Sequence, residues 1–434
     1  MLRDKTALRA TAPSILLVLN SFVWWIFISA IFNSTVNDLN LLETQKLYLF
    51  ITFYVGIGVA AIVGSKLFPR TRTKSLYVWL FIGTIATFLL TAVSSETLLI
   101  DILLTFFLGT SIGIGLPSCL SYFADSTSVK NRGFVGGIIW SIVGVTALIF
   151  AFLVNMLGHS EAIIALTMWR LFGCFAFIVL SRKHATPATK KAPSFLELIR
   201  KREILLYLFP WVMFCFINFA ELPILEREFG ADFVFVQLAE SVFVGIVAVV
   251  GGFIADIAGR KRVVIAGFVM LGIEYAALSA FSISPATLYL FLIFDGITWG
   301  LLVSVFLTVI WGDLGENFEK EKYYMLGGLP YLLANFLYIV IKPYAGDIPS
   351  PTAFSFASFF LFLAVLPLMY APETLPEKTI RERELKNYIE KAQKEATKAQ
   401  KKEEENTQRE NGDAEVESEG EDFKEKLKEA EKYY

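Results

Sequence analysis

Charged residues are scarce in most of this chain. Its 434 residues are 55% hydrophobic and 18% charged, and 33 of the 80 acidic and basic residues follow position 370. Soluble domains are typically about 45–50% apolar and about 25% charged, so the first 370 residues do not have a soluble composition. The net charge of −2 argues neither for nor against nucleic acid, and we expect no nucleic-acid partner. The composition indicates an integral membrane protein.

Residues that commonly hold metals or cofactors are also few. Cys119, Cys174 and Cys215 stand singly in apolar stretches, and His159 and His184 lie in predicted connections. None of the ligand spacings typical of zinc, haem or iron–sulfur sites occurs. Paired acids and histidine clusters are missing as well, which argues against an enzyme. We therefore predict no metal, no cofactor and no enzymatic activity.

Apolar runs long enough to cross a bilayer recur along the chain. A membrane helix needs about 20 residues, and runs without strand-like alternation must be helical because lipid cannot hydrogen-bond the backbone. The first run is interpreted as a retained helix, since no A-x-A cleavage site follows it. We predict an all-α integral membrane protein with twelve transmembrane helices, near residues 12–33, 47–68, 75–94, 98–122, 133–157, 161–181, 204–225, 234–255, 262–282, 286–311, 323–345 and 352–370.

Basic residues are divided unevenly between the connections. One alternate set, together with the N-terminal segment, holds about 21 Lys and Arg residues, whereas the other set holds about three, namely Lys46, Arg227 and Lys342. Basic loops remain on the cytoplasmic side of a membrane. We therefore expect a multi-pass protein of the cell membrane with both termini in the cytoplasm.

Two stretches in opposite halves share an ordered pattern. "GTSIGIGLPSCLSYFAD" (109–125) and "GITWGLLVSVFLTVIWGD" (296–313) each begin with G-x-x-x-G and end on Asp, and a basic residue and a Gly-Gly pair follow each. The offset of about 190 residues is typical of parallel repeats around an axis normal to the membrane. The sequence therefore predicts two pseudo-symmetric bundles of six helices.

The charges after position 370 form a separate segment. Glu–Lys pairs four residues apart support a solvated helix to about Lys402, and the few apolar residues beyond it indicate disorder. The predicted parts of the chain are an N-terminal bundle at 1–181, a cytoplasmic central loop at 182–203, a C-terminal bundle at 204–370 and a charged cytoplasmic tail at 371–434.

A sequence motif follows the eighth predicted helix, in "GGFIADIAGRKRVVIAGFV" (251–269). With the twelve spans, the repeat, the long basic central loop and "PET" at 372–374, this stretch resembles the major facilitator superfamily. The family signature here is G-x-x-x-D-[RK]-x-G-[RK]-[RK], with Ile257 in place of its first base. The matching residues are Gly252, Asp256, Gly259, Arg260 and Lys261.

The resemblance implies a conformational latch formed by these five motif residues. In the family, the acid binds the start of a helix in the other half, which here is the fifth helix at Gly133. Such a contact gains helix-dipole energy and would favour the state closed on the cytoplasmic side. The alternative is a local helix cap without a conformational role. Because Phe68 occupies the corresponding acid position after the second helix, we expect an asymmetric latch.

Ionisable side chains deep in the bilayer are further candidates, because inserting them costs at least about 2.5–3.5 kcal/mol. Asp295 lies near the middle of the tenth predicted helix, with Trp299 one turn on and on the same face. Asp295 is interpreted as a substrate or proton site, with a structural hydrogen-bonding role as the alternative. Tryptophans in a membrane bundle are more often core or interfacial anchors, which is the alternative for Trp24, Trp211 and Trp299. The resemblance implies a central cavity between helices one, four, seven and ten, shared by Asn20, Trp24, Trp211, Asn218, Asp295 and Trp299.

Other charges in the predicted helices leave more than one interpretation open. Glu240 would lie about a turn inside the outer face of the eighth helix, where protons have access, so proton coupling is one hypothesis. For Arg170 and Glu274 three interpretations remain open: a functional role, a structural pair, and a depth in the membrane that differs from the one inferred here. Glu221 is expected at the interface, and Lys342 is expected to extend toward water.

The function predicted from these features is secondary active transport of a small solute by alternating access, with H+ as the coupling ion. The protein is expected to act as a monomer in the lipid bilayer. Two alternatives remain: a facilitative uniporter of the same fold, and a transporter-like receptor that binds a solute without translocating it.

Overall fold

Helices make up nearly all the regular structure of the computed structural model. It describes residues 5–94, 97–181, 190–281 and 284–376, and short pieces at 385, 388–389, 392–398, 420 and 423–428. The chain divides into two compact units, Met1–Leu375 and Pro376–Tyr434. In the described part of the first unit, the single departure from helix and loop is an isolated bridge between Lys190 and Phe318. The tail helix and disorder predicted around Lys402 lie largely outside the described residues.

Long helices alternate with short helical segments. In chain order they are α1 (Lys5–Asp38), α2 (Glu43–Leu67), α3 (Arg72–Leu89), η1 (Leu90–Ala92), α4 (Leu98–Gly113), α5 (Leu116–Ser126), α6 (Arg132–Met156), α7 (His159–Leu180), α8 (Phe195–Arg200), α9 (Arg202–Phe229), α10 (Asp232–Ala258), α11 (Arg260–Ala280), α12 (Pro285–Leu302), η2 (Val303–Ile310), α13 (Trp311–Leu314), α14 (Glu321–Ile341), η3 (Lys342–Asp347) and α15 (Ser350–Tyr370).

Twelve helical segments of 21 to 30 residues in the described chain are apolar enough to cross a membrane, which confirms the predicted helix count. Several of these spans combine elements: α4 continues into α5, and α12 continues through the π-helical η2 into α13. Helix α8 occupies part of the connection that was predicted as the central loop.

The break between α4 and α5 has a local cause. Pro117 lies in the first turn of α5, where its missing N–H is tolerated but the preceding helix cannot continue through it. At Gly115 a Cβ atom would overlap the indole ring of Trp79. That indole donates a hydrogen bond to the Ser111 carbonyl oxygen at 2.6 Å. The fourth span therefore bends where a tryptophan of α3 packs against its backbone.

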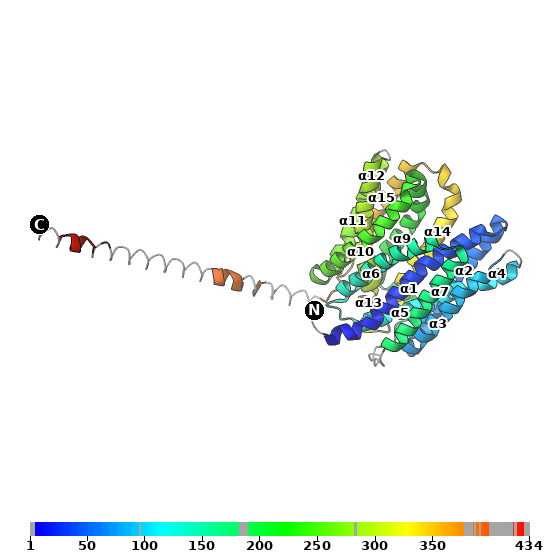
Figure 1. The fold of residues 1–434 in the computed structure, drawn as a ribbon, viewed down its shortest axis with the longest axis horizontal. Coiled ribbons are helices and arrows are strands. Elements are labelled where there is room, and N and C mark those ends of the chain that lie inside the picture. The colour runs from blue at the N-terminus through cyan, green and yellow to red at the C-terminus, as the bar shows by residue number, and fades with distance from the viewer. Residues whose placement is uncertain are drawn as a thin grey trace. The chain divides into compact units, whose positions relative to one another are not determined.

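The helices form two halves, α1–α7 and α9–α15. Figure 1 shows α2, α3, α4 and α7 grouped on one side of this unit and α10, α11, α12 and α15 on the other. The G-x-x-x-G pairs pack alike in each half: Gly109 and Gly113 contact α2, and Gly296 and Gly300 contact α10. The fourth span thus rests on the second and the tenth on the eighth, as expected for a repeat.

The halves meet where α6 packs against α10 and where α2 packs against α14. A Cβ atom on Gly252 of α10 would overlap the carbonyl oxygen of Gly133 of α6, and one on Gly137 would overlap that of Ala248. Small residues permit this close approach between membrane helices, where packing rather than hydrophobic burial drives association.

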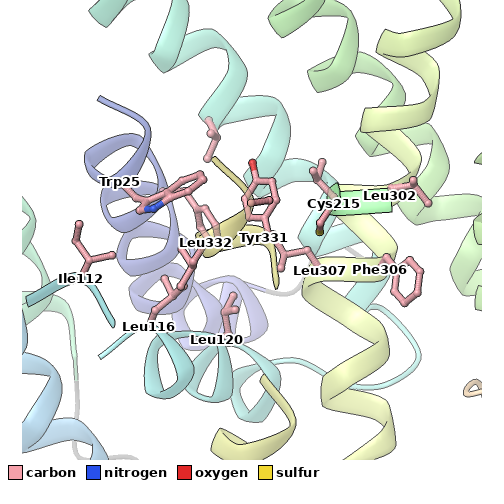
Figure 2. Packing of buried hydrophobic residues seen from close by; sticks show 14 of the residues in the cluster. Trp25, Ile112, Leu116, Leu120, Cys215, Leu302, Phe306, Leu307, Tyr331 and Leu332 are labelled. Atoms are coloured by element: carbon pink, nitrogen blue, oxygen red, sulfur yellow. The ribbon is translucent and has the colours of Figure 1, made fainter. Parts of the chain in front are cut away.

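Apolar side chains from both halves fill the centre between them. Figure 2 shows Trp25 of α1 beside Tyr331 and Leu332 of α14, near Leu116 and Leu120 of α5. All five side chains are buried, and the ring centroids of Trp25 and Tyr331 are 5.0 Å apart. We call these five residues the central plug.

Candidate functional site

The end of α10 contacts the opposite half of the molecule. Asp256, two residues before the end of α10, accepts hydrogen bonds from the backbone N–H groups of Gly133 (3.0 Å) and Phe134 (2.8 Å) at the start of α6. Helix N-termini carry unpaired N–H groups and a partial positive charge, so a carboxylate is favoured there. Asp256 therefore joins the eighth span to the fifth across the boundary between the halves.

The turn after Asp256 depends on glycine and on the PET segment. Gly259 has a φ of 105°, in the region that favours glycine, and a Cβ atom there would overlap the carboxylate of Glu373. That carboxylate instead accepts hydrogen bonds from the N–H groups of Arg260 (2.8 Å) and Lys261 (3.2 Å), which begin α11. The Lys261 ammonium donates to the Met369 carbonyl oxygen at 2.6 Å.

Two buried arginines from opposite halves share one acid. Arg260 forms ion pairs with Asp256 (2.9 Å) and Asp313 (3.2 Å), and it donates to the Val129 carbonyl oxygen of the other half at 2.6 Å. Arg132, at the start of α6, also pairs with Asp313. Both arginines are fully buried, so their charges depend on these partners.

A second network lies on the other side of the pseudo-symmetry axis. Arg72 pairs with Asp125 and, at 2.5 Å, with Glu321, while Lys320 pairs with Asp125 at 2.8 Å. The corresponding members of the two networks are each 188 positions apart in the sequence: Arg72 and Arg260, Asp125 and Asp313, Arg132 and Lys320. We call the face that holds both networks the basic face.

The two networks differ at one acid. Asp256 corresponds to Phe68 at the same 188-residue offset, and Gly133 corresponds to Glu321. In the first network the acid lies in the last turn of α10, and a glycine is the second residue of the facing helix α6. In the second, the acid Glu321 begins the facing helix itself and pairs with Arg72. A carboxylate thus occupies each side of the basic face, supplied from different positions.

A cavity of about 200 Å³ lies within the second half. It extends from Trp299, deep in α12, to Phe233, the second residue of α10. Of the predicted substrate and proton residues, the structure brings Asn218, Glu240, Asp295 and Trp299 together in its lining. The full lining comprises Asn218, Phe219, Leu222, Leu225, Phe233, Gln237, Glu240, Tyr275, Phe291, Asp295 and Trp299.

Two carboxyl groups line this cavity, those of Glu240 and Asp295, and the carboxyl groups of Glu274 and Glu221 lie near its lining; none of the four forms an ion pair among the described residues. Asp295 is 5% exposed, and its Oδ1 atom has no hydrogen-bond partner there; Glu240 and Trp299 lie beside its carboxyl group. Glu274 is fully buried, both of its carboxyl oxygens lack partners, and it interacts electrostatically with Asp295 and Glu240. Glu221, which we expected at the interface, is buried, and its Oε2 atom is likewise unpaired.

Asn20 and Trp24 face the interior of the first half and do not line this cavity. Both contact Arg170 of α7, whose Nη1 atom donates to Asn20 Oδ1 (2.9 Å) and Ser21 Oγ (3.1 Å). The guanidinium lies over the rings of Trp24 (4.1 Å) and Trp79 (4.4 Å). Arg170 is fully buried, and its Nε and Nη2 atoms have no hydrogen-bond partner in the described chain.

Trp211 is also outside the lining. Its indole donates to the Gly327 carbonyl oxygen at 2.5 Å and its ring stacks on Phe214, so it joins α9 to α14. Lys342, expected to reach water, is exposed and pairs with Glu226 at 3.2 Å. Arg170 and Glu274 do not form the structural pair with a charged residue that one interpretation gave them, since neither takes part in an ion pair among the described residues.

Sequence reasoning missed several of these residues. Gln237 and Tyr275 line the cavity, and Arg72 and Glu321 complete the second network. Arg72 and Glu321 sit at the ends of apolar runs, where they look like ordinary loop charges. A comparison of the two halves at a fixed offset of 188 residues would have identified Arg72, which corresponds to Arg260, but not Glu321, which corresponds to Gly133.

Comparisons with known proteins agree with this architecture. The family model described as Major Facilitator Superfamily matches residues 14–310. No curated protein sequence matches the chain significantly. Among solved structures, the transporter FucP in an outward conformation is similar, with a TM-score of 0.64 and 12% identity over 84% of this chain and 99% of that chain.

Two further solved structures cover the same shares of both chains. A variant of the E. coli fucose:proton symporter FucP gives a TM-score of 0.65 at 12% identity, and the human organic anion transporter MFSD10 gives 0.59 at 14%. At such identities the likeness establishes the fold alone. The family match spans more than half of the chain, and this protein therefore belongs to the major facilitator superfamily of multi-pass membrane transporters.

Proposed function

We propose that the protein is a secondary active transporter that moves a small solute by alternating access and couples this movement to protons. The observation that carries the proposal is the set of carboxyl groups at and near the cavity; among the described residues, Asp295 Oδ1 and both carboxyl oxygens of Glu274 have no hydrogen-bond partner. Ionised carboxylates without a countercharge are strongly unfavourable in a membrane interior. These groups must therefore hold protons or a cation, and exchange between the two would couple solute to proton movement.

The contacts on the basic face support the alternating-access part of the proposal. Asp256, Arg132 and Arg260 bond across the two halves there, and the central plug closes the middle. If this face is cytoplasmic, as the distribution of Lys and Arg predicts, the cavity belongs to the state that opens outward. Similarity to a transporter solved in an outward conformation supports the same assignment.

A row of aromatic rings connects the cavity to the central plug. The Trp299 ring centroid lies 6.0 Å from that of Tyr331, which lies 5.0 Å from that of Trp25 in the other half. Within the proposal, a change of occupant beside Asp295 shifts Trp299 and thereby the packing between the halves. Packed interfaces respond to small shifts by switching between discrete arrangements.

The remaining parts of the proposal concern the setting of the protein. The excess of Lys and Arg on one face supports a position in the cell membrane with both termini cytoplasmic. Each half contributes to the networks of the basic face within one chain, which supports action as a monomer.

Transport by purified protein in proteoliposomes tests the proposal. Vesicles that contain a pH-sensitive dye would be challenged with amines, sugars, amino acids and organic anions, each with a pH gradient. We expect one class to change the internal pH, and Asp295→Asn to abolish the change. Glu43→Gln, which removes an exposed carboxylate at the start of α2, serves as the control and should behave as wild type. Solute flux without a pH change would indicate a uniporter, and binding without flux a receptor; either result would overturn the proposal.

A further inference from the structure

We infer that the cavity between α9, α10, α11 and α12 binds a small organic cation, an amine or quaternary ammonium group attached to an apolar body. The inference names the substrate class of the proposed transporter. It rests on the proposed function for translocation, but binding can be tested separately.

The charge around the cavity favours a cation. Asp295 and Glu240 line it, and Glu274 and Glu221 lie close by in the same half. None of the lining residues is Lys, Arg or His, and none of the ion pairs in the described part of the chain involves these four acids. An anionic solute would add charge of the same sign, whereas a cation neutralises what is already there.

The cavity walls suit the body of an organic cation. Five aromatic side chains line it, from four helices: Phe219, Phe233, Tyr275, Phe291 and Trp299. The faces of aromatic rings attract ammonium groups and also pack well against apolar groups. The amides of Asn218 and Gln237 supply neutral hydrogen-bonding groups that can orient the ligand.

Size and ligand geometry distinguish this occupant from a drug-sized molecule and from a metal ion. The volume of about 200 Å³ is below the roughly 300–1,000 Å³ of sites for drug-sized ligands. Within the described residues, no three His, Cys, Asp or Glu side chains are arranged to hold a metal ion. Ring faces attract organic cations but provide no oxygen ligands for Mg²⁺ or Ca²⁺.

Binding of the cation should compete with protons. The titratable groups near Asp295 are Glu240 of α10 and Glu274 and Tyr275 of α11, and Glu221 of α9 lies near Tyr275. A carboxyl group that holds a proton has no charge to attract an ammonium group. Affinity should therefore rise as the pH is raised through the range in which these carboxyl groups lose their protons.

Calorimetric binding to the purified full-length protein tests the inference. The probes are butylamine, phenethylamine and benzyltrimethylammonium, with 2-phenylethanol and 3-phenylpropionate as neutral and anionic analogues and MgCl₂ as a metal control. We expect at least one amine to bind at least tenfold more tightly than both analogues. Asp295→Asn should weaken that binding at least tenfold. Trp299→Leu should also weaken it, but the amine should still bind more tightly than its neutral and anionic analogues. Glu43→Gln should leave the binding unchanged.

Several results would overturn the inference: no binding by any amine, equal or tighter binding of the alcohol or the carboxylate, displacement of the amine by Mg²⁺, or unchanged binding in Asp295→Asn. Thermal unfolding of each variant shows whether it is folded. If either Asp295→Asn or Trp299→Leu fails to fold, the other variant still tests the site. If amines bind as expected but produce no pH change in vesicles, proton coupling is wrong and the inference stands. If another solute class drives proton movement and amines do not bind, the inference alone is wrong.

Discussion

The carboxylate of Asp256 crosses the boundary between the two halves and accepts a hydrogen bond from the Gly133 amide, 3.0 Å away. The acid belongs to α10 and the amide to α6, so the bond exists only while these helix ends remain together. Separation of the halves on the basic face must break it. We therefore expect the bond to stabilise the closed basic face relative to any state in which that face opens.

Substitution of Asp256 by Asn should shift the protein toward opening of the basic face. The amide keeps one acceptor but loses the charge that interacts with the α6 N-terminus, which is worth about 0.3–2 kcal/mol, or about 2- to 30-fold in the ratio of states. The measurement is the rate at which a thiol reagent labels Leu120→Cys in the central plug. The background lacks Cys119, Cys174 and Cys215, all of which are buried.

A matched control for this prediction is Glu203→Gln. Glu203 is an exposed acid in the first turn of α9, and no hydrogen bond or ion pair across the halves involves it among the described residues. Its labelling rate should equal that of the parent. Equal rates in Asp256→Asn and the parent would show that Asp256 is only a local cap.

Gly252→Ala should open the basic face more strongly than Asp256→Asn. A methyl group at this position would overlap the Gly133 carbonyl oxygen, so α6 and α10 must move apart. Overpacking of this kind costs about 1–3 kcal/mol. Gly58→Ala in α2 is the control, because a Cβ atom there meets nothing within 4 Å. In the same assay, the Leu120→Cys reporter should be labelled faster in Gly252→Ala than in the parent, and at the parent rate in Gly58→Ala. A parent-like labelling rate in Gly252→Ala would contradict the close packing of α6 against α10.

Arg72 and Glu321 should act as one unit in the second network. Glu321→Gln is expected to destabilise the closed basic face by about 1–3 kcal/mol, since Arg72 keeps Asp125 as a partner. The double variant Arg72→Gln, Glu321→Gln should cost less than the sum of the two single changes, by about 0.5–3 kcal/mol. Labelling of the Leu120→Cys reporter in all four proteins gives this coupling energy. Strict additivity would mean that the ion pair does not help to close the face.

The parts of this structure that follow from the sequence are those set by chain length and local spacing. The twelve apolar runs must be helices because lipid offers the backbone no other hydrogen-bond partner. Asp295 and Trp299 share a helix face because they are one helical turn apart. The motif around Asp256 placed an acid where a helix end from the other half could receive it. These features need no knowledge of how neighbouring helices are rotated.

Helix rotation explains what the sequence did not predict. Apolar runs such as those containing Asn20 and Glu274 have hydrophobic residues on all sides, so periodicity does not indicate which side faces the centre. Asn20 therefore turned out to contact Arg170, and Glu274 turned out to join the acids of the cavity. The cavity is lined from α9, α10, α11 and α12 within the second half, whereas the expected cavity was one shared by helices one, four, seven and ten.

Arg170 offers a final prediction, because its charge is buried and pairs with no acid in the part of the chain that the structure describes. The contacts of the Arg170 side chain depend on its shape: the planar guanidinium stacks on Trp24 and Trp79 while it donates hydrogen bonds to Asn20 and Ser21. A lysine ammonium cannot stack on two rings, and its desolvation is less favourable, so Arg170→Lys should lose about 2 kcal/mol or more of stability.

Arg170→Met, by contrast, removes the buried charge and keeps an unbranched apolar side chain. It should unfold at the wild-type temperature or above, because apolar replacement of buried charges is often neutral or stabilising. Thermal unfolding in detergent compares the two variants, with Arg200→Lys at an exposed position of α8 as the control for the exchange itself. If Arg170→Lys is as stable as wild type and Arg170→Met is not, the positive charge rather than the stacked guanidinium holds α1, α3 and α7 together.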